Sequence, residues 1–166
     1  MTKLKSLSAA AVPAALERAA HYRLLNEPML AESICRDVLR VESHNQEALI
    51  TLLLAQTDQF DIHMTQAFKA AQQTLERLTG EYERTYYGAL ICERRAHWHL
   101  DRGAHGSGPV AYDWYRKAMD LYEAADEHSP PDNNDAVLRW NTCVRILRQR
   151  PNVKPTPKDT FQPLLE

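Results

Sequence analysis

The fold class is indicated most clearly by one stretch of the sequence, Ala111-Tyr-Asp-Trp-Tyr115-Arg-Lys-Ala118-Met119-Asp-Leu121. Ala111, Tyr115, Ala118 and Met119 are spaced i, i+4, i+7 and i+8, so they share one face of an α-helix. Two alanines on this face allow a neighbouring helix to approach closely, and the tyrosine ring fills the space beside them. We therefore expect this segment to be the second helix of a helical hairpin, with these side chains packed at its seam.

The composition of the 166-residue chain favours an all-α protein. Glycine occurs only five times, and the alternation of Val, Ile and Thr that is typical of strands is almost absent. The formal net charge of −2 indicates neither a nucleic-acid binder nor a membrane-surface binder. No run approaches the roughly 20 apolar residues that span a bilayer, and the apolar run near the N-terminus is too short for a signal peptide. We therefore expect a cytoplasmic protein.

Three cysteines, Cys35, Cys92 and Cys143, lie far apart in the sequence. Their odd number and the absence of a Cys-x-x-Cys pair argue against a disulfide framework and against a zinc knuckle. Each cysteine belongs to an apolar stripe of a predicted helix. We expect reduced thiols in the core.

Apolar periodicity predicts about seven helices, arranged as antiparallel hairpins. Their expected ranges are 13–26, 28–41, 46–59, 64–79, 81–102, 109–128 and 134–150. Asp58 to His63 is expected to form a turn, and Gly80 to stop the helix before it. The predicted organisation is an N-terminal leader at 1–12, a helical domain at 13–150 and an extended, Pro-rich tail at 151–166.

Small residues recur in the second helices of these hairpins, at Ala31, Ala67 and Ala111. The pattern Ala111-x-x-x-Tyr115-x-x-Ala118 resembles the second helix of the tetratricopeptide-repeat (TPR) family, whose unit is a helical hairpin of about 34 residues. Weaker matches are Ala31-x-x-x-Cys35 and Tyr87-Gly88-x-x-Ile91. The resemblance covers roughly residues 13–147 and implies a short TPR-like α-solenoid; an irregular helical bundle is the alternative.

The resemblance also implies a partner-binding groove, because first helices line the concave face of a TPR array. The matching positions of this chain, together with one amide from the last helix, are Leu16, Ala20, Arg23, Ile50, Leu54, Thr57, Thr85, Ala89, Cys92, Leu138, Asn141, Thr142 and Arg145. This groove would be apolar at its centre with an arginine at each end, which suits a peptide with acidic flanks. The paired Lys and Asn residues of the family's carboxylate clamp are not reproduced.

The segment from Ala136 to Lys158 carries four arginines, two lysines and no acidic residue, whereas Asp113 to Asp135 carries seven acids. One interpretation is a solvated basic face that is partly paired with the acidic helix beside it. The other is an anion-binding patch, in which Arg145, one turn from Asn141, binds a carboxylate.

Two segments contain residue types that are common in metal sites and in nucleotide-binding loops. His97 and His99 point to opposite sides of a helix, and Cys92 shares a face with His99 but lies about 10 Å from it along the axis. The glycine-rich loop that begins at Gly103 has no Lys-Ser or Lys-Thr pair and follows no strand, so it is not a nucleotide-binding phosphate loop. We expect no metal site, no cofactor and no catalytic centre.

The sequence therefore predicts a non-catalytic adaptor that binds a protein or peptide on the concave face of a TPR-like array. The alternative is a dedicated chaperone or regulatory subunit that shields one partner, as a monomer or as a homodimer through an exposed apolar face. A metal-binding or enzymatic protein is a third, weaker reading, and nucleic acid is not expected as a partner.

Overall fold

The computed structural model describes residues 2–156, and this part of the chain contains helices and no strand. The helices are α1 (Val12–Leu24), α2 (Pro28–Val41), α3 (Gln46–Thr57), α4 (Phe60–Leu75), α5 (Glu81–Arg102), α6 (Ser107–Glu127) and α7 (Asp135–Gln149), preceded by a 3-10 turn at Ala9–Ala11. The predicted all-α class is thus confirmed for the described residues, and so is the expectation of about seven helices.

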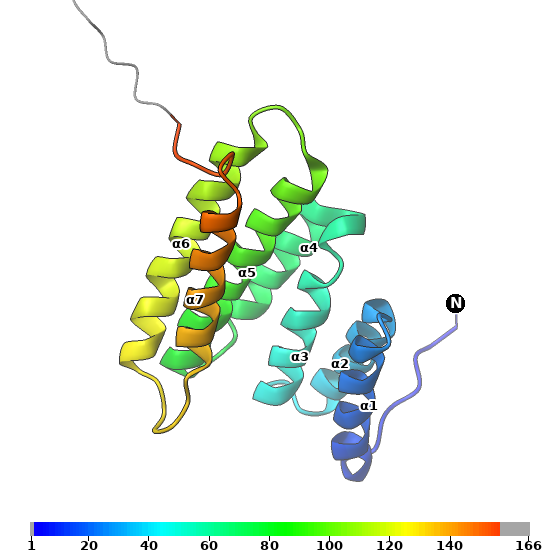
Figure 1. Cartoon of the computed structure of the whole chain (residues 1–166). Helices are drawn as coiled ribbons and strands as arrows, with labels where there is room; N and C mark the ends of the chain where they lie inside the picture. Colours follow the sequence, from blue (N-terminus) through cyan, green and yellow to red (C-terminus); the bar gives the residue numbers. More distant parts are fainter. Residues whose placement is uncertain (1, 157–166) are drawn as a thin grey trace, which may run out of the picture.

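Each helix packs against the next one along the chain, so the short connections produce a series of hairpins. The first helices of successive hairpins also meet, because α1 contacts α3 and α3 contacts α5. Figure 1 shows α5, α6 and α7 alongside one another at one end of the molecule, and α1 and α2 at the other end. The helices α1, α3, α5 and α7 can therefore contribute to one common surface.

The seam between α5 and α6 is the most extensive helix contact. Ala111, Tyr115, Ala118 and Met119 are buried there, as their spacing predicted. The buried residues of α5 in the same core cluster are small: Ala89, Cys92 and Ala96. Small side chains on both helices allow the two backbones to approach closely, and the rings of α6 fill the remaining space.

The turn between α3 and α4 differs from the prediction. α3 ends at Thr57, and α4 begins at Phe60 rather than at Met64. One helical turn is followed by a kink at His63, whose φ of −139° and ψ of 51° are not helical. Phe60 is buried in a core cluster with α3 and α5 residues, so packing explains why this segment is helical rather than an open turn.

The prediction that Gly80 stops α4 is wrong. α4 ends at Leu75, and Gly80 is the N-cap of α5 with extended backbone, at φ −70° and ψ 136°. Glycines with left-handed backbone stand instead on both sides of the α5–α6 loop, where Gly103 has φ 58° and Gly106 has φ 79°. These two positions permit the chain to reverse without strain.

Both ends of the helical domain continue into segments that pack against it. Leu7, within the predicted leader, lies against the cluster formed by α1, α2 and α3. Val153, within the predicted tail, is buried in the α5–α6–α7 cluster. Gly108 makes this possible, because a Cβ at that position would lie 2.2 Å from the carbonyl oxygen of Asn152. Residues 157–166 of the tail are outside the described part.

Among the helices of residues 2–156, none combines the length and the apolar character that crossing a membrane requires.

Candidate functional site

One hollow of about 430 Å³, which we call the charged hollow, is formed by helices that are distant in sequence. One side consists of Arg23 and Asn26 from the end of α1, with Thr57, Asp58, Phe60 and Asp61 from the junction of α3 and α4. The opposite side consists of Glu93, Arg94, His97, Trp98 and Asp101 from α5, with Arg139 from α7.

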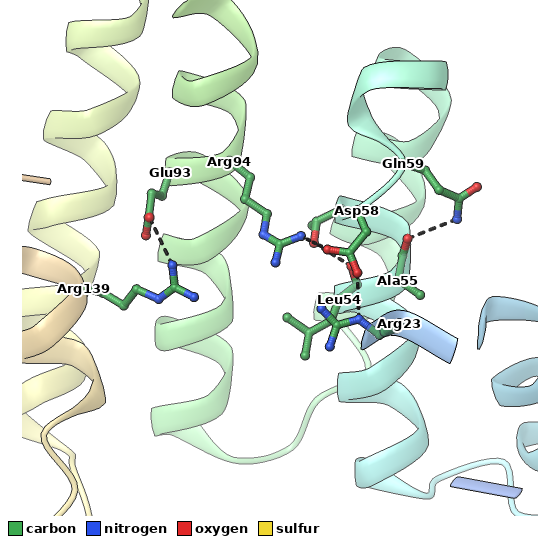
Figure 2. A network of polar contacts seen from close by, with 9 residues as sticks. Arg23, Leu54, Ala55, Asp58, Gln59, Glu93, Arg94 and Arg139 are labelled. Carbon is green, nitrogen blue, oxygen red and sulfur yellow. Dashed lines mark hydrogen bonds and ion pairs between the residues drawn. The ribbon is translucent and has the colours of Figure 1, made fainter. Parts of the chain in front are cut away.

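Asp58 joins three helices at the wall of the charged hollow. Its Oδ2 accepts a hydrogen bond from Nε of Arg23 at 2.7 Å, and its Oδ1 forms an ion pair with Arg94. Figure 2 shows Asp58 lying between the two guanidinium groups. Because α3 ends at Thr57, the Asp58 carboxylate is placed where both α1 and α5 can reach it. The contact therefore fixes the spacing of α1, α3 and α5 on this side.

Glu93 organises the second side. Its carboxylate is buried, and it accepts a 2.6 Å hydrogen bond from the hydroxyl of Tyr122 on α6. Arg139 of α7 donates to the other carboxylate oxygen at 3.2 Å, as Figure 2 shows. Burial raises the pKa of Tyr122, and the neighbouring Glu93 charge raises it further. A buried acid with two donors is a stable way to attach α6 and α7 to α5.

Farther along α5, the wall carries His97, Trp98 and Asp101. Nδ1 of His97 lies 2.7 Å from the hydroxyl of the buried Tyr115, so the imidazole is held by the α5–α6 seam. The Trp98 ring lies beneath the guanidinium of Arg102, 4.7 Å from its centre. Asp101 is exposed. These three side chains are thus presented from a rigid helix.

The thirteen positions predicted to line a groove are distributed differently. Arg23 and Thr57 do line the charged hollow. Leu16, Ala89 and Cys92 are buried in core clusters.

The other predicted positions are half-buried or exposed and lie outside the lining of the charged hollow: Ala20, Ile50, Leu54, Thr85, Leu138, Asn141, Thr142 and Arg145. Asn141 lines a separate hollow of about 240 Å³ between α6 and α7, next to Trp140.

The residues that the sequence interpretation missed follow a simple pattern. Glu93, His97 and Asp101 are spaced i, i+4 and i+8, so they form a polar stripe along the second half of α5. The prediction placed the groove on the first half of this long helix, where Ala89 and Cys92 face α6 instead. On α7 the lining residue is Arg139, the immediate neighbour of the predicted Leu138.

The basic face of α7 is not paired with the acidic helix α6 in the part of the chain that is described. Arg139 pairs with Glu93 of α5, and on α6 Arg116 pairs with Asp120 of its own helix. Pairing with α6, one of the two interpretations of the basic segment, is thus not found among these residues, and Arg139 binds the buried Glu93 instead. Arg145 is exposed and is not part of the charged hollow.

The cysteine prediction agrees with the structure, because Cys35, Cys92 and Cys143 are free and buried. Burial raises the pKa of Cys35 and of Cys143 to about 12. Between residues 2 and 156, His, Cys, Asp and Glu side chains do not gather in groups of three or more that could hold a metal ion.

A scan against models of protein families, a search of curated proteins and a search of solved structures each gave no significant match for this chain.

Proposed function

We propose that this chain is a non-catalytic adaptor and that the charged hollow is where it binds a segment of a partner protein. The observation that carries the proposal is that residues at α1, α3, α5 and α7 together line the charged hollow. A surface shared by several packed helices holds its shape without a ligand, which lowers the entropic cost of binding.

The chemistry of the lining also supports a peptide or protein rather than an apolar small molecule. Sites for small molecules are lined mainly by hydrophobic side chains. The charged hollow is lined mainly by charged and polar groups, and it stays open to solvent along its edge at Asp61 and Asp101. Charged groups at such an edge give specificity and speed of association to protein contacts.

The test is to block the charged hollow with a bulky side chain. His97 is exposed on its wall, and a His97→Trp variant would place a bulky ring there. His105, exposed in the α5–α6 loop, offers the same substitution away from the hollow as a matched control. Asp101→Trp is a second blocking variant, in case the loss of the His97 contact with Tyr115 reduces stability.

Each variant is immobilised at equal amounts, and the proteins it captures from a cell extract are quantified by mass spectrometry. We expect the wild type and His105→Trp to capture the same proteins and the two blocking variants to lose them. Circular dichroism verifies that all variants are folded. If both folded blocking variants capture the same proteins as the wild type in equal yield, the charged hollow is not the binding site.

A further inference from the structure

The charges that line the hollow are not equally available to a ligand. All three arginines are already bound to carboxylates of the chain itself, Arg23 and Arg94 to Asp58, and Arg139 to Glu93. Within residues 2–156, Asp61 and Asp101 belong to no such ion pair, and both are exposed.

Arg23 and Arg94 together carry one positive charge more than Asp58 neutralises, but both guanidinium groups are largely buried. The side chains of Arg23 and Arg94 are only 21% and 27% exposed, because both are engaged with Asp58. The lining as a whole contains four acids and three arginines, so its formal sum is negative. The groups that a ligand meets first are therefore the two free carboxylates.

Exposed large apolar side chains adjoin several lining residues of the charged hollow in the sequence. Leu24 and Leu25 lie between the lining residues Arg23 and Asn26, and they are 86% and 56% exposed. Ile62 follows the lining residue Asp61 and is 63% exposed. Met29 and Leu30 extend the same corner into the start of α2, and both are exposed.

Exposed large apolar side chains that gather at one place on a protein mark an interaction site. Here Leu24, Leu25 and Ile62 directly adjoin, in the chain, residues that line a hollow whose free charge is negative. The exposed apolar side chains and the free negative charge are independent features. The apolar side chains belong to the corners where α1 meets α2 and α3 meets α4, whereas the charges belong to side chains that line the hollow.

From these two features we infer that the charged hollow recognises a partner segment that carries both basic and large apolar side chains. This inference rests on the proposed function and names the class of its ligand. Lysine or arginine side chains would lie near Asp61 and Asp101, and apolar side chains would cover Leu24 and Leu25 at the α1–α2 corner and Ile62 at the α3–α4 corner. The acidic flanks suggested by the sequence are not favoured, because Arg23 is already bound to Asp58 and Arg145 lies outside the hollow.

The test uses three synthetic amphipathic peptides of equal length as probes, composed of Leu and Lys, of Leu and Glu, and of Ser and Lys. Binding to the full chain is measured by fluorescence anisotropy. We expect the Leu-Lys peptide to bind at least roughly tenfold more tightly than either of the others. Added salt should weaken this binding, because exposed ion pairs are screened.

Two double variants separate the two contributions. Asp61→Asn with Asp101→Asn should weaken binding of the Leu-Lys peptide roughly five- to tenfold, since two exposed ion pairs are lost. Asp113→Asn with Glu127→Gln changes the net charge by the same amount on the exposed side of α6 and should have little effect. Leu24→Ser with Leu25→Ser should weaken binding of the same peptide, whereas Leu4→Ser with Val110→Ser, also exposed, should not.

The inference is overturned if the Leu-Glu peptide binds as tightly as the Leu-Lys peptide, if no peptide binds, or if the hollow and control variants behave alike. It is also overturned if light scattering shows a homodimer that Leu24→Ser with Leu25→Ser converts to a monomer, because the corner would then be a self-association surface. The proposed function fails separately, through unchanged capture by His97→Trp and Asp101→Trp. Loss of capture in those variants without a preference for the Leu-Lys peptide would retain the function and remove only this inference.

Discussion

The hydroxyl of Tyr122 on α6 donates a 2.6 Å hydrogen bond to Oε2 of Glu93 on α5, and both side chains are buried. Arg139 of α7 donates to the other oxygen of the same carboxylate. One buried acid thus joins three helices next to the charged hollow. Removing one of these donors should lower the free energy of unfolding, because a buried charge then lacks a hydrogen-bond partner.

We predict that Tyr122→Phe lowers the free energy of unfolding by roughly 1.5–3 kcal/mol, because a hydrogen bond to a charged group is lost while the ring remains. Urea denaturation followed by circular dichroism measures the change. Tyr112→Phe is the matched control, since Tyr112 packs against the same core cluster from the same helix but does not contact Glu93. Equal stability of the two variants would show that the hydrogen bond contributes nothing net.

Gly108 permits the segment after α7 to dock on α6. Its position would bring a Cβ within 2.2 Å of the carbonyl oxygen of Asn152, which is backbone and cannot rotate away. We predict that Gly108→Ala displaces residues 152–153 and exposes Val153, with a loss of roughly 1.5–3 kcal/mol. Hydrogen exchange at the Val153 amide, which donates to the carbonyl of Arg150 at 2.9 Å, should become faster.

The control for that substitution is Gly88→Ala in the interior of α5. A Cβ at Gly88 would lie 3.5 Å from a methyl group of Leu75, which is an ordinary contact. Because alanine is the better helix former, this variant should be more stable by roughly 0.5–1 kcal/mol. Unchanged exchange at Val153 in Gly108→Ala would mean that the tail moves to accept the methyl group without undocking.

The packing face of α6 at the α5–α6 seam could be predicted from sequence, because it depends on the spacing of residues within one helix. Helical periodicity determines which residues share a face, and small residues on a face indicate close packing. That is why the burial of Ala111, Tyr115 and Ala118 was foreseen correctly. The helix boundaries with clear apolar stripes, such as Glu81 to Arg102, were also predicted correctly.

The charged hollow could not be predicted in the same way, because it depends on pairs far apart in the chain. Asp58 reaches Arg23 and Arg94 only after α1, α3 and α5 have packed. Which polar face of a helix turns toward a neighbour is determined by the packing of the apolar faces, and an error of one position rotates the expected site by about 100°. At α7 the predicted groove position is Leu138, whereas its neighbour Arg139 lines the charged hollow.

The buried thiols give a prediction for alkaline pH. Burial raises the pKa of Cys35 and of Cys143 from 9.0 to about 12. Between these values the unfolded chain has lost the thiol protons and the folded chain retains them. The unfolded state therefore binds fewer protons, and stability falls as the pH rises from about 9 to about 12. Each thiol adds a slope of about 1.4 kcal/mol per pH unit in that window.

Urea denaturation at several pH values between about 8 and 11 tests this, with Cys35→Ala/Cys143→Ala as the comparison. The double variant should start from a lower stability, because two core side chains are truncated, but its stability should decline less steeply with pH. The tyrosines remain in both proteins; among them, Tyr115 and Tyr122 have a pKa that burial raises most and that the nearby Cys143 raises further, so the substitution also changes their titration. Parallel curves for the two proteins would contradict the prediction.

The close seam between α5 and α6 gives the sharpest prediction about folding. Ala118 is fully buried, and it shares its core cluster with Ala89, Cys92 and Ala96 of α5. An indole at this position cannot be accommodated unless the two helices separate, so Ala118→Trp should cost at least roughly 1–3 kcal/mol. Asp113→Trp places the same ring on the exposed side of α6 and should leave the melting temperature nearly unchanged.

Because the seam also positions His97 through Tyr115, Ala118→Trp should lose structure and partner capture together. A variant that keeps the melting temperature of the wild type but no longer captures its partners would show that Ala118 belongs to a binding surface rather than to the seam.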